Sequence, residues 1–171
     1  MIDQKVIYDT RQLATLIDEA HKHFEDNKRF FTILKKLKKD KIDALFHQFH
    51  DDVFTQIDCL KCANCCKTTS PRIFSMDVER MSKACRMSSR EFMNLYVSVD
   101  EDDDMVFKSQ PCPFLDAENY CSIYKSRPLA CREYPHTNRK KMIPVLEITL
   151  QNTLICPAVF LIVMRIKAQI K

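Results

Sequence analysis

The 171 residues include 46% hydrophobic and 29% charged side chains, enough apolar material for one folded domain, so extended disorder is not expected. Glycine is absent, which argues against glycine-rich phosphate loops, dinucleotide fingerprints and common S-adenosylmethionine sites, and thus against a self-sufficient nucleotide-dependent enzyme. The formal net charge of +4 would fall to about zero if eight thiolates held two divalent ions, so it does not indicate nonspecific nucleic-acid binding.

The N-terminal third has the apolar periodicity of helices. Two helices are predicted, one from Leu13 to Phe24 and one from Phe30 to Leu37. A third, capped by Asp40, is predicted over residues 42–57 and leads directly into the first cysteines. The lysines within residues 35–41 are predicted to form a solvated face, with contacts to nucleic acid or an acidic partner as the alternative.

The middle of the chain carries two helix-start signals. Ser75 is predicted to cap a short helix, with Cys85 on its apolar side. Ser88 and Glu91 have the spacing of a capping box and start a second helix. The side chains expected to face inward from this second helix are Phe92, Leu95, Tyr96 and Val99.

Loops and weak strand signals follow. The acidic run at residues 100–104 lacks the glycine turn and alternating ligands of a calcium loop, so it is predicted to be a solvated loop. Short strands are predicted over residues 105–108 and 145–149. Pro157 suits the first turn of a final helix. One face of that helix would carry Val159, Ile162, Val163, Ile166 and Ile170.

The first residues contain acidic side chains and no apolar run, so they do not indicate a secretory signal. The longest apolar stretch, residues 158–164, is shorter than the roughly 18 residues that a membrane span requires. We therefore expect a cytoplasmic protein that does not enter the membrane. In this reducing compartment nine cysteines are better explained as metal ligands than as disulfides.

The strongest local signal is the sequence CLKCANCC, in which two-residue spacers let thiolates converge from one short loop. Its first three cysteines also repeat the start of bacterial ferredoxin runs, which wrap a 4Fe–4S cluster. Because Cys65 and Cys66 are adjacent, one of them is expected to serve a second site.

Cysteines further along the chain complete two sets of four. Cys112 and Cys156 are each followed by proline, as in the Cys-Pro ending of ferredoxin runs. Cys121 and Cys131 lie near Arg127 and Arg132, which are predicted to stabilise thiolates. The predicted metal ligands are Cys59, Cys62, Cys65, Cys66, Cys112, Cys121, Cys131 and Cys156.

Other candidate ligands are weaker. Cys85 has no spacing partner and is predicted to be a core residue. His47 and His50 share a helix face but are predicted to be ordinary polar residues. His136 lies five residues after Cys131, and a role near the metal is left open for it.

We predict a mainly α fold with minor short β structure. Residues 1–57 would form an N-terminal helical support, and residues 58–171 a cysteine-cluster metal-binding domain, the two making one compact unit. In this arrangement the helical segment packs on an irregular, metal-stapled core that a C-terminal helix closes.

With these residues assembled, the chain resembles the YkgJ-type cysteine-cluster family, described as zinc- or iron-chelating and often as iron–sulfur proteins. The resemblance runs from Ile57 to the C-terminus through IDCLKCANCCK, PCPFLDAENYCSIYKSRPLACREYPH and NTLICPAV. It implies the same eight cysteine ligands and leaves Cys85 outside them. Relatives commonly carry glycine where this chain has Ala63, so Asn64 is expected to adopt any left-handed turn instead.

Three functions follow as hypotheses. The first is a metal-binding protein with an iron–sulfur cluster, zinc or both, in a structural or redox role with a redox or protein partner. The second, implied by a similar flagellin lysine methylase, is a protein-lysine methyltransferase-like enzyme. The third is a zinc-based nucleic-acid module, motivated by the lysine run. We expect no self-sufficient catalytic activity, and no catalytic residue is predicted.

Overall fold

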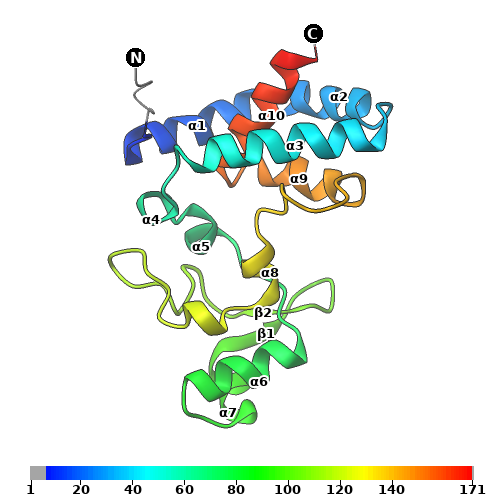
Figure 1. Cartoon of the computed structure of the whole chain (residues 1–171). Helices are drawn as coiled ribbons and strands as arrows, with labels where there is room; N and C mark the ends of the chain where they lie inside the picture. The colour runs from blue at the N-terminus through cyan, green and yellow to red at the C-terminus, as the bar shows by residue number, and fades with distance from the viewer. Residues whose placement is uncertain (1–6, 171) are drawn as a thin grey trace. The chain divides into compact units, whose positions relative to one another are not determined.

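The computed structural model describes residues 7–170 and confirms a mainly α fold with two short strands (Figure 1). The chain divides into two compact units. Unit 1 combines residues 7–62 with residues 135–170, and unit 2 is the intervening segment 63–134. The units do not follow the predicted division at residue 57, because the C-terminal segment packs with the N-terminal helices.

Unit 1 begins with three helices, α1 (Thr10–Lys22), α2 (Phe24–Leu34) and α3 (Lys39–Phe54), as the apolar periodicity predicts. Asp9 and Gln12 form a capping box that starts α1. Asp40 does not cap α3, contrary to prediction. The N-cap is Lys38, so Asp40 lies in the first turn, where its negative charge suits the helix dipole.

The rest of unit 1 comprises α4 (Cys59–Cys62), the 3-10 turn η2 (Ile143–Val145), α9 (Leu146–Asn152) and α10 (Pro157–Gln169). Pro157 opens α10 as predicted, and α10 packs against α1 and α3 (Figure 1). Its apolar side chains meet those of α1 and α3 in one core. The fully buried members of this core include Leu13, Ile42, Phe46, Val53, Ile162 and Ile166.

The predicted strand at residues 145–149 is wrong, because this segment enters helix α9. Its β-branched residues favour a strand locally, but Leu146 and Leu150 lie one helical turn apart and are both buried. The Thr149 hydroxyl donates a hydrogen bond of 2.7 Å to the Val145 carbonyl, which is a common use of threonine inside a helix. Tertiary burial thus overrides the local propensity.

Unit 2 contains α5 (Asn64–Thr68), α6 (Ser75–Ala84), α7 (Ser89–Tyr96), the 3-10 turn η1 (Tyr124–Ser126) and α8 (Leu129–Glu133). The Ser88–Glu91 capping box is confirmed. Ser75 is the first residue of α6 and not its cap.

Helix α7 turns its apolar side chains only partly inward. Phe92 is fully buried and stacks near Phe114, as an inward position requires. Leu95 and Val99 are 60% and 62% exposed, so their predicted inward placement is wrong. Tyr96, one helical turn after Phe92, packs on Phe92 and Phe114, so the inward face of α7 carries Phe92 and Tyr96 and not Leu95. The helix ends at Tyr96, and Val99 lies on the strand that follows.

Strands β1 (Val97–Val99) and β2 (Met105–Phe107) form the antiparallel sheet of unit 2, with Val97 opposite Phe107. Strand β2 confirms the prediction over residues 105–108, whereas β1 was not predicted. The acidic run 100–104 forms the connecting loop as expected. Within it, the Asp100 carboxylate accepts hydrogen bonds from the backbone N–H groups of Asp102 and Asp104.

The structure also bears on the predictions for the lysine run and for a membrane span. The lysines within residues 35–41 are exposed, and Lys35 pairs with Glu147 at 3.1 Å. Among residues 7–170, no single helix is both long and apolar enough to cross a bilayer. Residues 143–152 and 157–169 reach that length and apolar content only as a pair, which is bent by 118° at the break between its helices.

Candidate metal centre

The sequence CLKCANCC folds as two short helical turns, α4 and α5, joined at Ala63. Ala63 itself takes the left-handed conformation, with φ 47° and ψ 18°, so the expectation that Asn64 would do so is wrong. Asn64 is instead the first residue of α5. A left-handed alanine costs about 1–2 kcal/mol relative to the right-handed region, a cost that glycine at this position would avoid.

Four predicted ligands come together within unit 2: Cys66 in α5, Cys131 in α8, and Cys112 and Cys121 in the loops between. The Cys112 N–H donates a 2.8 Å hydrogen bond to the Cys66 carbonyl, which ties the loop to α5. An isolated bridge between Leu115 and Cys121 folds the chain back toward Cys112. The negative charges of Cys66, Cys112 and Cys121 each act on Cys131, so the four side chains lie within electrostatic reach of one another.

These four thiols resist ionisation together. Burial raises the pKa of Cys112 to about 11 and that of Cys131 to about 12, and it also raises the pKa of Cys121. Repulsion from neighbouring thiolates adds to each of these increases. A bound cation would reverse both effects, because it compensates the charge that burial and repulsion oppose. The set therefore has the electrostatics of a cation site.

The surrounding groups favour the thiolate form. Backbone N–H groups of Phe114 and Leu115 hydrogen-bond the Cys112 sulfur, and the N–H of Ile123 hydrogen-bonds that of Cys121. Such bonds to sulfur stabilise and tune metal-bound thiolates. These hydrogen bonds were not predicted. Because Pro113 has no N–H, the first backbone donor after Cys112 that can reach its sulfur is the N–H of Phe114.

Positive charges act on the same sulfur atoms. Arg127 lowers the pKa of both Cys121 and Cys131 relative to burial alone, as the sequence predicts. A hydrogen bond from the Cys65 side chain, with help from the charge of Lys67, lowers the pKa of Cys66 to about 7. Cys66 is thus the member of the set that is most readily a thiolate.

Unit 1 contains the other group of predicted ligands, Cys59, Cys62 and Cys156. Burial raises the pKa of Cys156 to about 12, and the charges of Cys59 and Cys62 raise it further, so these sulfur atoms are also neighbours. The N–H groups of Ala158 and Val159, in the first turn of α10, hydrogen-bond the Cys156 sulfur. This repeats the Cys-Pro pattern seen at Cys112.

The remaining candidates lie elsewhere. Cys85 packs beside the apolar core of unit 2, as predicted. The His47 ring contacts the Arg139 carbonyl at 2.6 Å, and the His50 ring contacts the Thr137 hydroxyl at 2.8 Å. His136 belongs to unit 1 and has a left-handed backbone with φ 67°. A role for it near the metal stays a prediction.

All nine cysteines are reduced. Within residues 7–170, no group of three or more His, Cys, Asp or Glu side chains could hold a metal ion in its present arrangement. Within each of the two thiol sets, a metal would therefore have to draw the sulfur atoms closer together. Soft sulfur donors, backbone N–H groups aimed at them and nearby cationic side chains fit zinc or an iron–sulfur cluster.

Comparison with known proteins agrees with this chemistry. No curated protein and no solved structure matches the chain. The family model CxxCxxCC, described as "Putative zinc- or iron-chelating domain", matches residues 58–156, which is more than half of the chain and includes all eight predicted ligands. The chain therefore belongs to the CxxCxxCC family of zinc- or iron-chelating domains.

Proposed function

We propose that this chain is a cytoplasmic metal-binding protein that holds an iron–sulfur cluster, zinc or both through its eight predicted cysteine ligands. One centre uses Cys66, Cys112, Cys121 and Cys131 of unit 2. A second draws on Cys59, Cys62 and Cys156 of unit 1. Cys65 remains a predicted ligand, and its side chain hydrogen-bonds Cys66.

The observation that carries the proposal is the convergence of four thiols from four separate segments of unit 2. An isolated buried cysteine is ordinarily a small apolar residue. Here each of Cys112, Cys121 and Cys131 lies within reach of the charges of others in the set, and two of them accept backbone N–H groups at sulfur. A shared cation explains why ionisable groups that repel one another are gathered in one place.

A structural role suits the small size of unit 2. Its buried apolar cluster contains eight residues, against which Cys112 and Cys121 pack. A core of this size in a segment of about 70 residues rarely supplies more than about 3–5 kcal/mol. A structural zinc site contributes about 10–16 kcal/mol in small domains, so a bound metal would add substantially to the stability of unit 2. Zinc would act only in this way, whereas an iron–sulfur cluster would also supply a redox couple.

Anaerobic purification followed by analysis of iron, zinc and acid-labile sulfide tests the proposal. Iron with stoichiometric sulfide and a reducible brown chromophore would support an iron–sulfur protein in a redox or structural role. Colourless protein with stoichiometric zinc would support the structural role. Protein that holds neither metal, whether purified or reconstituted with each, would refute the proposal.

A pair of serine variants locates the metal. Cys131→Ser removes one sulfur from the unit 2 set, and we expect it to lose that metal and to lower the thermal stability of unit 2. Cys85→Ser is the matched control, because Cys85 is also partly buried in unit 2 but lies outside the set. Equal metal content and thermal stability in Cys131→Ser and the wild type would contradict the assignment.

A further inference from the structure

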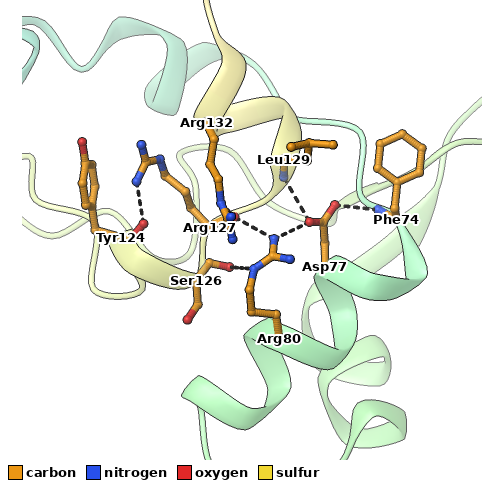
Figure 2. Close-up of polar contacts among 8 residues, drawn as sticks. All are labelled: Phe74, Asp77, Arg80, Tyr124, Ser126, Arg127, Leu129 and Arg132. Atoms are coloured by element: carbon orange, nitrogen blue, oxygen red, sulfur yellow. Dashed lines mark hydrogen bonds and ion pairs between the residues drawn. The ribbon is translucent and has the colours of Figure 1, made fainter.

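A buried carboxylate in unit 2 serves three donors at once. Asp77 lies in the first turn of α6 and is 2% exposed. Figure 2 shows its polar contacts. One carboxylate oxygen accepts the N–H of Phe74 at 3.0 Å, which caps α6. The other oxygen accepts a hydrogen bond of 3.0 Å from the N–H of Leu129, which is the first residue of α8. The same oxygen also contacts the Arg80 guanidinium. Asp77 thus joins the beginnings of two helices that are far apart in sequence.

Arg80 lies one helical turn after Asp77 and reaches the same loop. Its guanidinium donates to the Ser126 carbonyl at 3.3 Å and to the Arg127 carbonyl at 2.9 Å (Figure 2). The Arg132 side chain donates to the same Arg127 carbonyl at 3.1 Å. The Asp77–Arg80 ion pair on α6 therefore hydrogen-bonds both the carbonyls of Ser126 and Arg127 and the N–H of Leu129.

The held loop connects two members of the thiol set. The loop follows the turn that begins after Cys121, and the loop itself ends at Leu129, two residues before Cys131. Pro128 has no N–H, and α8 is only five residues long, so local hydrogen bonds alone give this segment little support. The contacts from Asp77 and Arg80 add long-range attachment at the place where a small backbone shift would move the Cys131 sulfur.

The apolar core does not require such a pair. Asp77 is buried, whereas 31% of the Arg80 side chain is exposed, so the carboxylate loses its hydration and the guanidinium loses part of its own. Such a pair contributes little net stability compared with apolar residues of similar size. Here the lost hydration is compensated by bonds directed to the loop between two predicted ligands. A requirement for accurate placement of those ligands accounts for the pair.

We propose that Asp77 and Arg80 are positioning residues for the unit 2 metal centre. They fix the backbone of residues 126–129 so that the sulfur atoms of Cys121 and Cys131 meet the metal together with those of Cys66 and Cys112. This inference rests on the proposed function, because it requires that these four cysteines bind metal. Neither residue is proposed as a metal ligand.

Cobalt(II) titration of the full-length, metal-free, reduced chain tests the inference. A Cys59→Ser/Cys62→Ser background leaves the unit 2 centre as the one observed. We compare Asp77→Asn and Arg80→Lys in this background, since each keeps the size of the side chain but removes part of the hydrogen-bond pattern. Loss of such supporting groups typically weakens metal binding by about 10–100-fold, and we expect a loss in this range for both variants.

The partly exposed ion pair between Arg72 and Asp104, 2.9 Å apart in the same unit, supplies matched controls. Arg72→Lys and Asp104→Asn make the same chemical changes away from residues 126–129, and we expect their cobalt affinities to remain within about twofold of the background, as usual for surface substitutions. The thiolate-to-cobalt charge-transfer absorption should weaken in Arg80→Lys and remain unchanged in the controls.

The outcomes separate positioning from simple stability. Denaturant unfolding of the metal-free variants measures stability independently of metal. Reduced affinity with an altered cobalt spectrum supports positioning, and Arg80→Lys provides this readout even if Asp77→Asn does not fold. Wild-type affinity and spectrum in Arg80→Lys, or a loss no greater than in the controls, would overturn the inference while leaving the proposed function intact. A background chain that binds no cobalt would instead refute the unit 2 centre itself.

Discussion

Metal binding to the unit 2 set should release about three protons per ion near pH 8. In the metal-free chain, burial raises the pKa of Cys112 to about 11 and of Cys131 to about 12, and raises that of Cys121, so these three are protonated thiols at this pH. Cys66, with a pKa of about 7, is already mostly a thiolate. Because a metal binds the thiolate, each of the three protonated groups must lose its proton.

The difference in the number of bound protons between the metal-free and metal-bound states fixes how metal affinity depends on pH. Lowering the pH favours the proton-bound, metal-free state, so metal affinity must fall as the pH falls. With three protons released, the affinity changes by about 1000-fold per pH unit between roughly pH 7.5 and 9. Below the pKa of Cys66 a fourth proton is released and the dependence becomes steeper.

Zinc titration by calorimetry measures the proton number directly. The Cys59→Ser/Cys62→Ser background is titrated in two buffers of different ionisation enthalpy, and the difference in heat gives the protons released. Adding Cys131→Ser should reduce the number by about one if binding persists, whereas adding Cys85→Ser should leave it unchanged. Release of one proton or fewer in the background chain would refute the assignment of these four thiols to one ion.

Three further predictions concern the metal-free, reduced chain and are measured by chemical unfolding. Ala63→Gly should raise the free energy of unfolding by up to about 1 kcal/mol, because glycine takes a positive φ without strain; a decrease would argue against the left-handed turn. Ser88→Ala should lower it by about 1 kcal/mol through loss of the capping box, and Phe92→Ala by about 3–5 kcal/mol through a core cavity; equal effects would contradict their different burial. Burial raises the pKa of Cys156 from 9.0 to about 12, so its contribution to stability is present below pH 9 and lost as the pH rises toward 12, and Cys156→Ser should reduce this loss.

Local rules predicted the helices well where several signals coincide. The Ser88–Glu91 capping box and Pro157 each combine an apolar pattern with a helix-start signal, and both helices are confirmed. The helices predicted from periodicity alone over Leu13–Phe24 and Phe30–Leu37 are confirmed as well, with shifted bounds. The prediction failed at residues 145–149, where β-branched side chains lie on a helix that the core of unit 1 buries. It also failed at Ala63. Steric preference favours asparagine over alanine in the left-handed region, but the junction between α4 and α5 falls at Ala63, so this residue takes the positive φ.

The sequence predicts which residues are candidate ligands better than it predicts their grouping. Spacing singled out Cys59, Cys62, Cys65 and Cys66, but it could not show that Cys66 joins three distant cysteines of unit 2, because that grouping depends on loop closure. The Asp77–Arg80 pair was also missed. Asp77 has the position of a capping residue in α6, yet its bond to Leu129 links segments that no local pattern connects.

The discontinuous make-up of unit 1 has a consequence for synthesis on the ribosome. The chain emerges from its N-terminus, and domains generally fold as units while they are being made. All four cysteines of the unit 2 set emerge from the ribosome before Cys156 does. Helix α10, which packs against α1 and α3, emerges after Cys156. Under the proposed function, unit 2 could therefore bind its metal during synthesis, whereas Cys59 and Cys62, translated earlier, would have to await Cys156.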